Sequence, residues 1–316
     1  MKICVAGAGA LGCALGGVLT EAGHEVWLVN RGQAQVDALR MHGLRLRENG
    51  VDRVVPVRAT RSYAEIVASS GVMDLVIVLV KSFHTREAIT AALPVVGEHT
   101  VVLSLQNGLG HEDLLAEIVG RQKVLAGKTY VGGVLLAPGH IIAGVAGKET
   151  MLGELDGSLS ERVQHIAAAF NAAGLLTHVS PNILGAMWDK LLINVATGAL
   201  SAITLLPYGE LYQVPEVQAC GVAAVAEAMA VAAASGITLQ TTDAQQPWAK
   251  AAAGMPPEFK ASMLQSLEKG SVTEIDFVNG AVVRQGARCG VPTPVNQALV
   301  ACLRGIERGL FGVPKA

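Results

Sequence analysis

The sequence predicts an α/β domain with a doubly wound parallel sheet, followed by an all-helical domain. Short runs rich in Val, Ile and Leu alternate with helical patterns through the first half, a glycine-rich turn joins the first run to the first helix, and the Val-rich runs stop after about residue 180. Continuous apolar runs are typical of strands buried on both faces of a parallel sheet. We therefore expect two domains, residues 1–179 and 180–316, a division that suits a chain of 316 residues.

Five apolar runs predict the strands of the first domain. Residues 10–22 and 84–93 lie between such runs and predict crossover helices, which completes a β-α-β alternation. Residues 139–147 and 149–155 predict a further strand or hairpin before a helix at about 158–173. The five runs are "KICVAGA" (2–8), "EVWLVNR" (25–31), "DLVIVLVKS" (74–82), "TVVLSLQNG" (100–108) and "KVLAGKT" (123–129).

The second domain is predicted to be helical because its apolar stretches have helical length and period and end at glycines. The stretch 191–209 carries no charged residue, but polar residues such as Asn194 interrupt it and Pro207 closes it. These interruptions favour a buried core helix over a membrane span. The helical stretches are residues 183–200, 217–236, 258–270 and 274–290.

Composition excludes several classes of function. A net charge of −2 provides no basic field for nucleic acid or an anionic membrane surface. The five cysteines form no CxxC pair, and Cys4, Cys13, Cys220 and Cys302 lie in apolar contexts, which suits reduced, buried thiols and a cytoplasmic location. The N-terminal apolar stretch is cut by glycines and followed by Glu21, unlike a signal peptide. The eight histidines show no HExxH or HxH spacing, so we expect no metal.

The turn Gly7-Ala8-Gly9-Ala10-Leu11-Gly12 fits the pattern G-x-G-x-x-G. This pattern allows a tight turn, close approach of the backbone to a pyrophosphate, and contact between the following helix and the strand. The free N–H groups at the start of the helix then face the phosphates. Since a strand precedes the turn and a helix and second strand follow, we predict a Rossmann-type dinucleotide site.

The second strand ends in Asn30-Arg31, where an NAD-binding domain would carry an acidic residue for the ribose 2′-hydroxyl. A carboxylate would repel a 2′-phosphate, whereas an arginine binds it with paired, charge-assisted hydrogen bonds. Asn30 can bond the ribose or the phosphate. We therefore predict NADP(H) as the cofactor; the alternative is that Arg31 is a solvated surface residue.

Two further strand ends carry polar residues that suit a ligand. Lys81 ends "LVIVLVK" and Asn107 lies in "QNGLG", and both fall at the carboxyl edge of the sheet, where ligands bind in such folds. Lys81 suits the phosphate end of the cofactor, and the Asn107 amide suits the nicotinamide or the substrate. A plain strand-end lysine and an ordinary Asn-Gly turn are the alternatives.

Lys190, Asn194, Thr197 and Ser201 follow one another at i, i+4, i+7 and i+11 and therefore lie on one face of a helix. The rest of this helix is almost wholly apolar, which suggests a polar stripe that lines a mostly dry cleft. A partly buried lysine has a lowered pKa and can serve as a general acid. The stripe equally allows Lys190 to pair with a carboxylate at the domain surface.

Glu274 lies in "SVTEIDFVNGAVV", where Ile275, Val278 and Val282 form the packing stripe. Glu274 and Asp276 lie off the centre of this stripe. Either could be a solvated carboxylate favoured by the helix dipole, so position alone does not single out Glu274.

These motifs, in this order and spacing, resemble the ketopantoate reductases (2-dehydropantoate 2-reductases) over nearly the whole chain. The motifs "WDKLLIN" and "TEIDFVNGAVV…GVPTPVN" are more specific than the glycine pattern. The resemblance implies a Rossmann domain followed by a helical domain, with NADPH and substrate in the cleft between them. It also implies reduction of a 2-oxo acid, with 2-dehydropantoate reduced to pantoate for pantothenate and coenzyme A biosynthesis as the first expectation. The motifs are the glycine turn, "LVK", "QNGLG", "WDKLLIN" and "TEIDFVNGAVV…GVPTPVN".

The resemblance also assigns roles. It implies that Lys190 is the general acid that protonates the C2 oxygen, and that Glu274 bonds the cofactor ribose or a substrate hydroxyl. Asn107 and Asn194 would orient the nicotinamide and the substrate. Ser262 would meet the carboxylate side of the substrate and Gly133 would lie by the cofactor.

Three positions depart from the family pattern, which often has asparagine where this chain has Gly198, Tyr208 and Phe259. These asparagines would contact the polar substrate, so the reaction class is a firmer expectation than the substrate. The alternatives are a reductase of the same family acting on another, bulkier or more apolar 2-oxo acid, and an NADP(H)-sensing regulator without turnover. The apolar helices leave room for a homodimer face, which sequence does not distinguish from core.

Overall fold

The computed structural model describes residues 1–312 and divides into two compact units. The first unit contains residues 1–106 and 111–183, and the second contains residues 107–110 together with the chain from Leu184 onward. The division therefore falls between residues 183 and 184, and the short loop 107–110 packs with the second unit although its sequence neighbours belong to the first.

An eight-stranded sheet forms the centre of the first unit, in the order β12-β11-β8-β7-β6-β1-β2-β5. The strands from β8 to β5 in this order are all parallel, whereas β11 runs antiparallel to β8. All five apolar runs are strands of this sheet, so that prediction is confirmed. The strands are β1 (Lys2–Ala6), β2 (Glu25–Val29), β5 (Arg58–Thr60), β6 (Met73–Val78), β7 (Val96–Ser104), β8 (Val124–Thr129), β11 (Thr150–Glu154) and β12 (Thr177–Val179).

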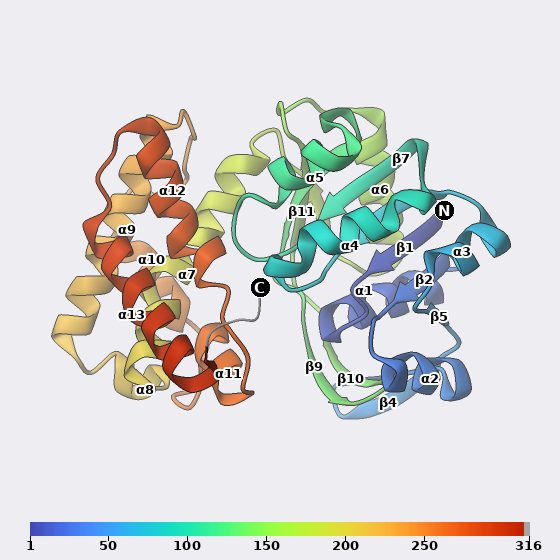
Figure 1. Cartoon of the computed structure of the whole chain (residues 1–316), viewed down its shortest axis with the longest axis horizontal. Helices are drawn as coiled ribbons and strands as arrows, with labels where there is room; N and C mark the ends of the chain where they lie inside the picture. The colour runs from blue at the N-terminus through green and yellow to red at the C-terminus, as the bar shows by residue number, and fades with distance from the viewer. Residues whose placement is uncertain (313–316) are drawn as a thin grey trace. The chain divides into compact units, whose positions relative to one another are not determined.

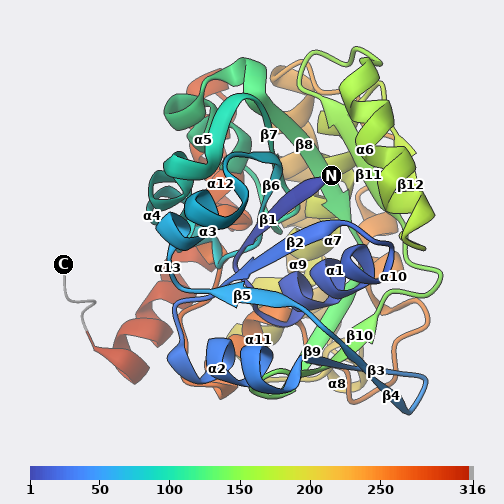
Figure 2. The same ribbon diagram turned by 90° about the vertical axis from the view of Figure 1, so that its right-hand side faces the viewer.

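Helices cover both faces of this sheet, as a doubly wound domain requires. One face packs against α1 (Ala10–Glu21), α2 (Gln33–His42) and α6 (Glu161–Ala172). The other packs against α3 (Tyr63–Ser70), α4 (Thr85–Ala92) and α5 (His111–Val119). Figure 2 shows α3, α4 and α5 on one side of the strands and α1 and α6 on the other.

A second, four-stranded sheet in the order β4-β3-β10-β9 packs against α1. Sequence analysis expected only the segment around 139–147. It missed the β3–β4 hairpin, in which Arg45 and Arg47 alternate with the buried Leu44 and Leu46. The turn carried a signal, since Asn49 and Gly50 both take positive φ, as a tight hairpin turn needs. The strands are β3 (Leu44–Glu48), β4 (Val51–Val55), β9 (Gly132–Ala137) and β10 (His140–Gly144).

The second unit is helical throughout its described residues, which confirms the fold class (Figure 1). Its core includes Leu192, Val195, Ala228 and Val282. The alanine-rich α9 approaches α7 closely, because a Cβ at Gly221 would lie 2.6 Å from the Ala196 carbonyl oxygen. The helices are α7 (Ile183–Thr204), α8 (Tyr208–Leu211), α9 (Pro215–Ala234), α10 (Gln245–Ala252), α11 (Ser262–Glu268), α12 (Asn279–Cys289) and α13 (Pro294–Phe311).

Two of these helices, α7 and α9, are long and apolar enough to cross a membrane by length and composition alone. Core helices of water-soluble proteins meet the same criterion, and α7 is mostly buried within its unit. Its side chains Leu191, Leu192 and Val195 belong to the apolar core. The structure therefore places α7 as the core helix that the sequence predicted.

Candidate active site

The glycine turn joins β1 to α1 and meets all three steric demands of the predicted motif. Gly7 has a φ of +117°, and a Cβ there would lie 2.6 Å from the Leu79 carbonyl carbon. A Cβ at Gly12 would lie 2.2 Å from the Gly7 carbonyl oxygen, so the helix can pack on the turn only with glycine at this position. At Gly9, by contrast, a Cβ would meet no atom within 4 Å. The turn thus leaves open space at the N-terminus of α1, as binding of a pyrophosphate requires.

Asn30 braces this turn from the end of β2. Its side-chain N–H donates to the Ala8 carbonyl at 2.8 Å, and its side-chain oxygen accepts from Gly32 N–H at 2.8 Å. Buried Gln35 donates to the same Ala8 carbonyl at 3.3 Å. Sequence analysis expected Asn30 to bond the ribose or the phosphate; the structure shows that its amide first fixes the backbone on which a nucleotide would lie.

Arg31 extends into solvent and pairs with Glu87 of α4. Its Nη1 lies 3.1 Å from the Glu87 carboxylate, and the two side chains are 65% and 63% exposed. A pair this exposed contributes about 0–1 kcal/mol. The guanidinium is therefore available to a stronger anion such as a phosphate, although a carboxylate now lies beside it.

Lys81 and Gly133 flank the same turn within the first unit. The chain leaves β6 through Leu79 and Val80, whose backbone packs against Gly7, and reaches the exposed Lys81. A Cβ at Gly133 of β9 would lie 2.9 Å from the Ala10 carbonyl oxygen. Lys81 therefore follows a segment that contacts the glycine turn, and Gly133 itself lies against the start of α1.

Lys190 and Asn107 meet in the second unit, although they are far apart in sequence. The Lys190 ammonium donates to the Asn107 side-chain oxygen at 2.7 Å. Lys190 and Asn194, one turn further along α7, are both half-buried. Two of the predicted catalytic and substrate residues are thus in direct contact, and a third lies on the same helical face.

The far end of the polar stripe departs from the prediction, because it does not line a cleft. Thr197 and Ser201 are fully buried. The Thr197 hydroxyl lies 2.9 Å from the Tyr208 hydroxyl, and the Ser201 hydroxyl donates to the Leu206 carbonyl at 2.8 Å. These hydroxyls bond groups within the helical core, so only the Lys190–Asn194 half of the stripe can serve a ligand.

Glu274 begins a 3-10 turn, Ile275–Phe277, rather than a continuous helix through residue 290. The Leu109 N–H donates to the Phe277 carbonyl at 2.9 Å, which joins the loop 107–110 to this turn. Ile275, Val278 and Val282 are buried, as the packing stripe predicted. Half-buried Glu274 therefore lies on the turn that holds the Asn107 loop.

Sequence reasoning missed the residues that fix this turn from behind. Asn279 and Asn296 are fully buried, and the Asn279 side-chain N–H donates to the Asn296 side-chain oxygen at 3.0 Å. Asn296 donates in turn to Glu227 at 2.7 Å, and the same carboxylate accepts the Val295 and Asn296 backbone N–H groups at the start of α13. The signal was two asparagines in otherwise apolar helical segments, "DFVNG" and "PTPVN".

Asp189 is a second missed residue, adjacent to Lys190 on α7. Its carboxylate accepts the backbone N–H groups of Gln240 and Thr241 at 3.0 and 2.9 Å. These bonds attach the segment before α10 to the helix that carries the lysine. Asp189 therefore stabilises this region of α7.

Two of the three positions that depart from the family pattern contact each other within the second unit. The rings of Tyr208 and Phe259 meet edge to face at 5.0 Å, and the Tyr208 N–H donates to the Phe259 carbonyl. A Cβ at Gly198 would meet the Met263 methyl group at 3.4 Å. Ser262, beside Met263, is exposed at the start of α11. Tyr208 and Met263 are buried, so these contacts belong to the core of the second unit.

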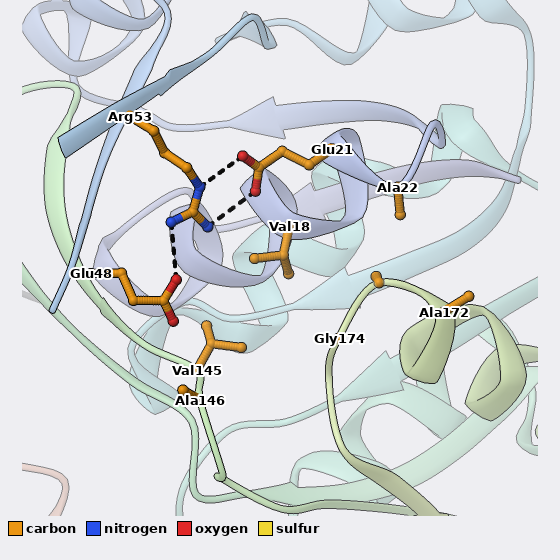
Figure 3. Close-up of a pocket in the computed structure, with 10 residues that line it drawn as sticks. Val18, Glu21, Ala22, Glu48, Arg53, Val145, Ala146, Ala172 and Gly174 are labelled. Carbon is orange, nitrogen blue, oxygen red and sulfur yellow. Dashed lines mark hydrogen bonds and ion pairs between the residues drawn. The ribbon is translucent and has the colours of Figure 1, made fainter. Parts of the chain in front are cut away.

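A surface pocket in the first unit lies away from these residues (Figure 3). Its volume is about 380 Å³, and Arg53 in it bonds both Glu21 and Glu48. Glu21 ends α1, so the pocket is one helix length from the glycine turn, about 18 Å at 1.5 Å per residue. Among the described residues no cluster of three or more His, Cys, Asp and Glu side chains is placed to hold a metal.

Comparison with protein families matches both parts of the chain. The family described as "Ketopantoate reductase PanE/ApbA" matches residues 3–157, and the C-terminal domain of the same family matches residues 182–307. Together the two matches span most of the 316 residues.

Curated relatives align over almost their full length. A 2-dehydropantoate 2-reductase of Halobacterium salinarum is 34% identical, with 98% of this chain and 99% of the relative covered. The enzyme of that name from Archaeoglobus fulgidus is 32% identical, with 98% and 99% covered.

Solved structures agree with the fold. A PanE/ApbA family ketopantoate reductase from Ralstonia eutropha superposes with a TM-score of 0.88 at 37% identity, covering 98% of this chain and 99% of the other. A ternary D-mandelate dehydrogenase structure with NADH and anilino(oxo)acetate has a TM-score of 0.89 at 27% identity, with 98% and 99% covered. With both domains matched and relatives above 30% identity along the whole chain, this protein belongs to the ketopantoate reductase family of oxidoreductases.

Proposed function

We propose that this chain reduces a 2-oxo acid to the 2-hydroxy acid with NADPH, and that 2-dehydropantoate, reduced to pantoate for pantothenate and coenzyme A biosynthesis, is its first candidate substrate. The observation that carries this proposal is the 2.7 Å contact between the Lys190 ammonium and the Asn107 side-chain oxygen. It brings a proton donor and an amide together from distant segments of the chain. A binding module without turnover has no need of this arrangement.

The chemistry assigns a distinct task to each group. NADPH supplies the hydride that adds to C2 of the substrate. Lys190 donates a proton to the C2 oxygen as negative charge develops there, which lowers the barrier by acid catalysis and by charge stabilisation. Asn107 accepts a hydrogen bond from the ammonium and so holds it in one orientation. Asn194, one helical turn away, suits a hydrogen bond to the substrate.

The glycine turn supports nucleotide binding. The open space at Gly9 and the N-terminus of α1 suit a pyrophosphate. Arg31 supports NADPH over NADH, because its guanidinium suits a 2′-phosphate. The mandelate dehydrogenase structure contains NADH, so the cofactor preference of this chain rests on Arg31.

Arg31→Asp is expected to lower NADPH affinity about 10- to 100-fold, since it removes a charge-assisted contact to the 2′-phosphate and adds a repelling carboxylate. NADH affinity should stay within a few-fold of wild type. Fluorescence titration with each cofactor measures both constants. Arg86→Asp is the matched control, because Arg86 is also an exposed arginine paired with a glutamate. An unchanged NADPH to NADH ratio in Arg31→Asp would remove Arg31 from cofactor choice.

The test of the proposed function is NADPH oxidation at 340 nm with a panel of 2-oxo acids, 2-dehydropantoate first, each repeated with NADH. Fast turnover of 2-dehydropantoate supports the first candidate substrate. No turnover across the panel, with NADPH still bound, would contradict the enzymatic proposal and favour an NADP(H)-sensing regulator.

A second candidate substrate is a 2-oxo acid with an aromatic or branched apolar side chain. It is favoured by Gly198, Tyr208 and Phe259, which stand where the family pattern often has asparagines that would contact a polar substrate. Of these, Phe259 is only half-buried. The relative crystallised with anilino(oxo)acetate, an aryl 2-oxo acid analogue, has the same fold. Phenylglyoxylate and 2-oxoisovalerate in the panel separate this candidate from 2-dehydropantoate.

The buried thiols support a reducing compartment, and we propose the cytoplasm. Burial raises the pKa of Cys4 and of Cys13 to about 12. Thiols that are buried and protonated are unreactive, and the five cysteines are all unpaired. The expectation of burial was wrong for the other two thiols, because Cys220 is half-buried and Cys302 is exposed.

A further inference from the structure

The loop 107–110 contains two glycines with nearly the same positive φ and different surroundings. Gly108 has a φ of +97° and Gly110 a φ of +96°, so a side chain at either would be strained. A Cβ at Gly108 would lie 2.5 Å from the Phe277 carbonyl oxygen and 2.8 Å from the Phe277 Cβ. A Cβ at Gly110 would meet no atom within 4 Å. Only Gly108 is therefore required by a contact as well as by its conformation.

The surface that receives Gly108 is built for this contact. In a continuous helix the Phe277 carbonyl would accept the N–H of Ala281, but that N–H donates to Val278 instead, at 3.1 Å. The Phe277 carbonyl accepts the Leu109 N–H at 2.9 Å. The break in the helix thus provides an acceptor for the loop.

The turn is also held rigidly from its other side. Ile275 and Val278 are buried, and Asn279 of α12 is bonded to Asn296 of α13 in the core. Asp276 pairs with Arg304 at 2.6 Å. A loop that docks on this turn is therefore placed on a fixed support.

We propose that Gly108 is a positioning residue for the general acid. Its lack of a side chain lets the loop dock on the Phe277 carbonyl, and this docking places the Asn107 side-chain oxygen against the Lys190 ammonium. The effect on catalysis rests on the proposed function, in which Lys190 donates the proton. The docking of the loop does not depend on that function.

The docking has a defined effect on the lysine. An acceptor oxygen at 2.7 Å stabilises the ammonium form, which raises the pKa of an amine relative to the same site without the acceptor. The carboxylates on the adjoining elements are Asp189, which is bonded to Gln240 and Thr241, and Glu274 on the 3-10 turn. Moving Asn107 away therefore removes this stabilisation of the ammonium form and leaves the Lys190 side chain less well oriented.

The decisive comparison is Gly108→Ala against Gly110→Ala, because both glycines have nearly the same positive φ, at which any side chain is strained. We expect kcat of Gly108→Ala to fall about 10- to 100-fold, the scale of a misplaced catalytic group, with the alkaline limb of its pH profile at lower pH. Gly110→Ala should keep the wild-type pH profile. Gly108→Ala should add little to the loss in a Lys190→Ala background, because the two act through one group. Equal losses in both glycine variants, or an unmoved alkaline limb, would overturn the proposal.

Two readouts do not depend on turnover and so separate this proposal from the proposed function. Hydrogen exchange of the Leu109 amide should accelerate in Gly108→Ala and not in Gly110→Ala. Acetic anhydride should modify Lys190 faster in Gly108→Ala, since more of the amine is deprotonated, as peptide mass spectrometry would show. If the wild-type protein reduces no 2-oxo acid yet both differences appear, the docking stands and the proposed function fails. If both glycine variants behave alike in both readouts, the docking proposal fails.

Should Gly108→Ala not fold, Asn107→Leu and Asn107→Asp test the same link. Leucine approximates the size of asparagine without an acceptor, whereas aspartate keeps an oxygen at the position that Lys190 contacts. Acetylation of Lys190 should accelerate in Asn107→Leu and return to the wild-type rate or below it in Asn107→Asp. Similar rates in the two variants would show that Asn107 does not position the lysine.

Discussion

Lys190→Ala is expected to lower kcat about 10²- to 10⁴-fold, the range that a positioned proton donor contributes. NADPH affinity should remain near the wild-type value, because the proposed phosphate contacts lie at the glycine turn and at Arg31 and not at Lys190. The loss should appear in kcat and kcat/KM together, since the proton is transferred only in the transition state. Steady-state kinetics and a fluorescence titration with NADPH measure the two effects.

Two variants control this result. Lys250→Ala removes an exposed lysine of α10 and should leave kcat unchanged. Lys190→Arg keeps the positive charge but not a usable acid, because the guanidinium pKa exceeds 12. Recovery of most of the activity in Lys190→Arg would show charge stabilisation without proton transfer. Wild-type turnover in Lys190→Ala would remove the lysine from the mechanism.

The strands could be predicted wherever both faces of a strand are buried, because such a strand is a continuous run of apolar residues. The run "DLVIVLVKS" is apolar along its length because β6 lies between β1 and β7 with helices on both faces. The glycine turn could be predicted because Gly7 and Gly12 each satisfy a separate steric requirement. The β3–β4 hairpin was missed although the alternation of leucine and arginine at residues 44–47 and the Asn49-Gly50 turn are both local signals of a hairpin.

The site could be predicted residue by residue, but not its connections. Nothing in the sequence pairs Arg31 with Glu87, because the two lie more than 50 residues apart and meet only in the folded domain. The spacing of Thr197 and Ser201 placed them correctly on the face of Lys190, yet spacing cannot show that Tyr208 and the Leu206 carbonyl bury their hydroxyls. Periodicity gives the face of a helix, and tertiary contacts decide which part of that face a ligand can reach.

The same limit applies to the turn after Glu274. The pattern of Ile275, Val278 and Val282 fits a helix, and all three are buried as it requires. The segment instead breaks into a 3-10 turn, and the Phe277 carbonyl at its end accepts the Leu109 N–H, which lies over 160 residues earlier in the chain. A partner so distant leaves no local trace in the sequence. Only the two asparagines that support this turn, Asn279 and Asn296, could have been noticed in the sequence.

Glu112→Gln is expected to stabilise the folded protein at neutral and alkaline pH. Glu112 is buried in the first turn of α5, and this burial raises the pKa of its carboxyl group from an ordinary value of 4.5 to about 7. Between these values the unfolded chain releases a proton that the folded chain retains. The free energy of unfolding therefore falls as pH rises through this window, by about 3 kcal/mol in total.

Urea unfolding at a series of pH values from 4 to 8 measures this effect. Glutamine has the same shape and no proton to lose, so the variant should gain about 3 kcal/mol over wild type at pH 8 and almost nothing at pH 4. Glu117→Gln, on the same helix, is the matched control: Glu117 is exposed, and its hydrogen bond and ion pair with Arg86 lower its pKa. That control should show no gain at pH 8, because an ionised carboxylate with a cationic partner favours the folded state. A stability difference between wild type and Glu112→Gln that did not change with pH would mean that Glu112 is ionised in the folded protein.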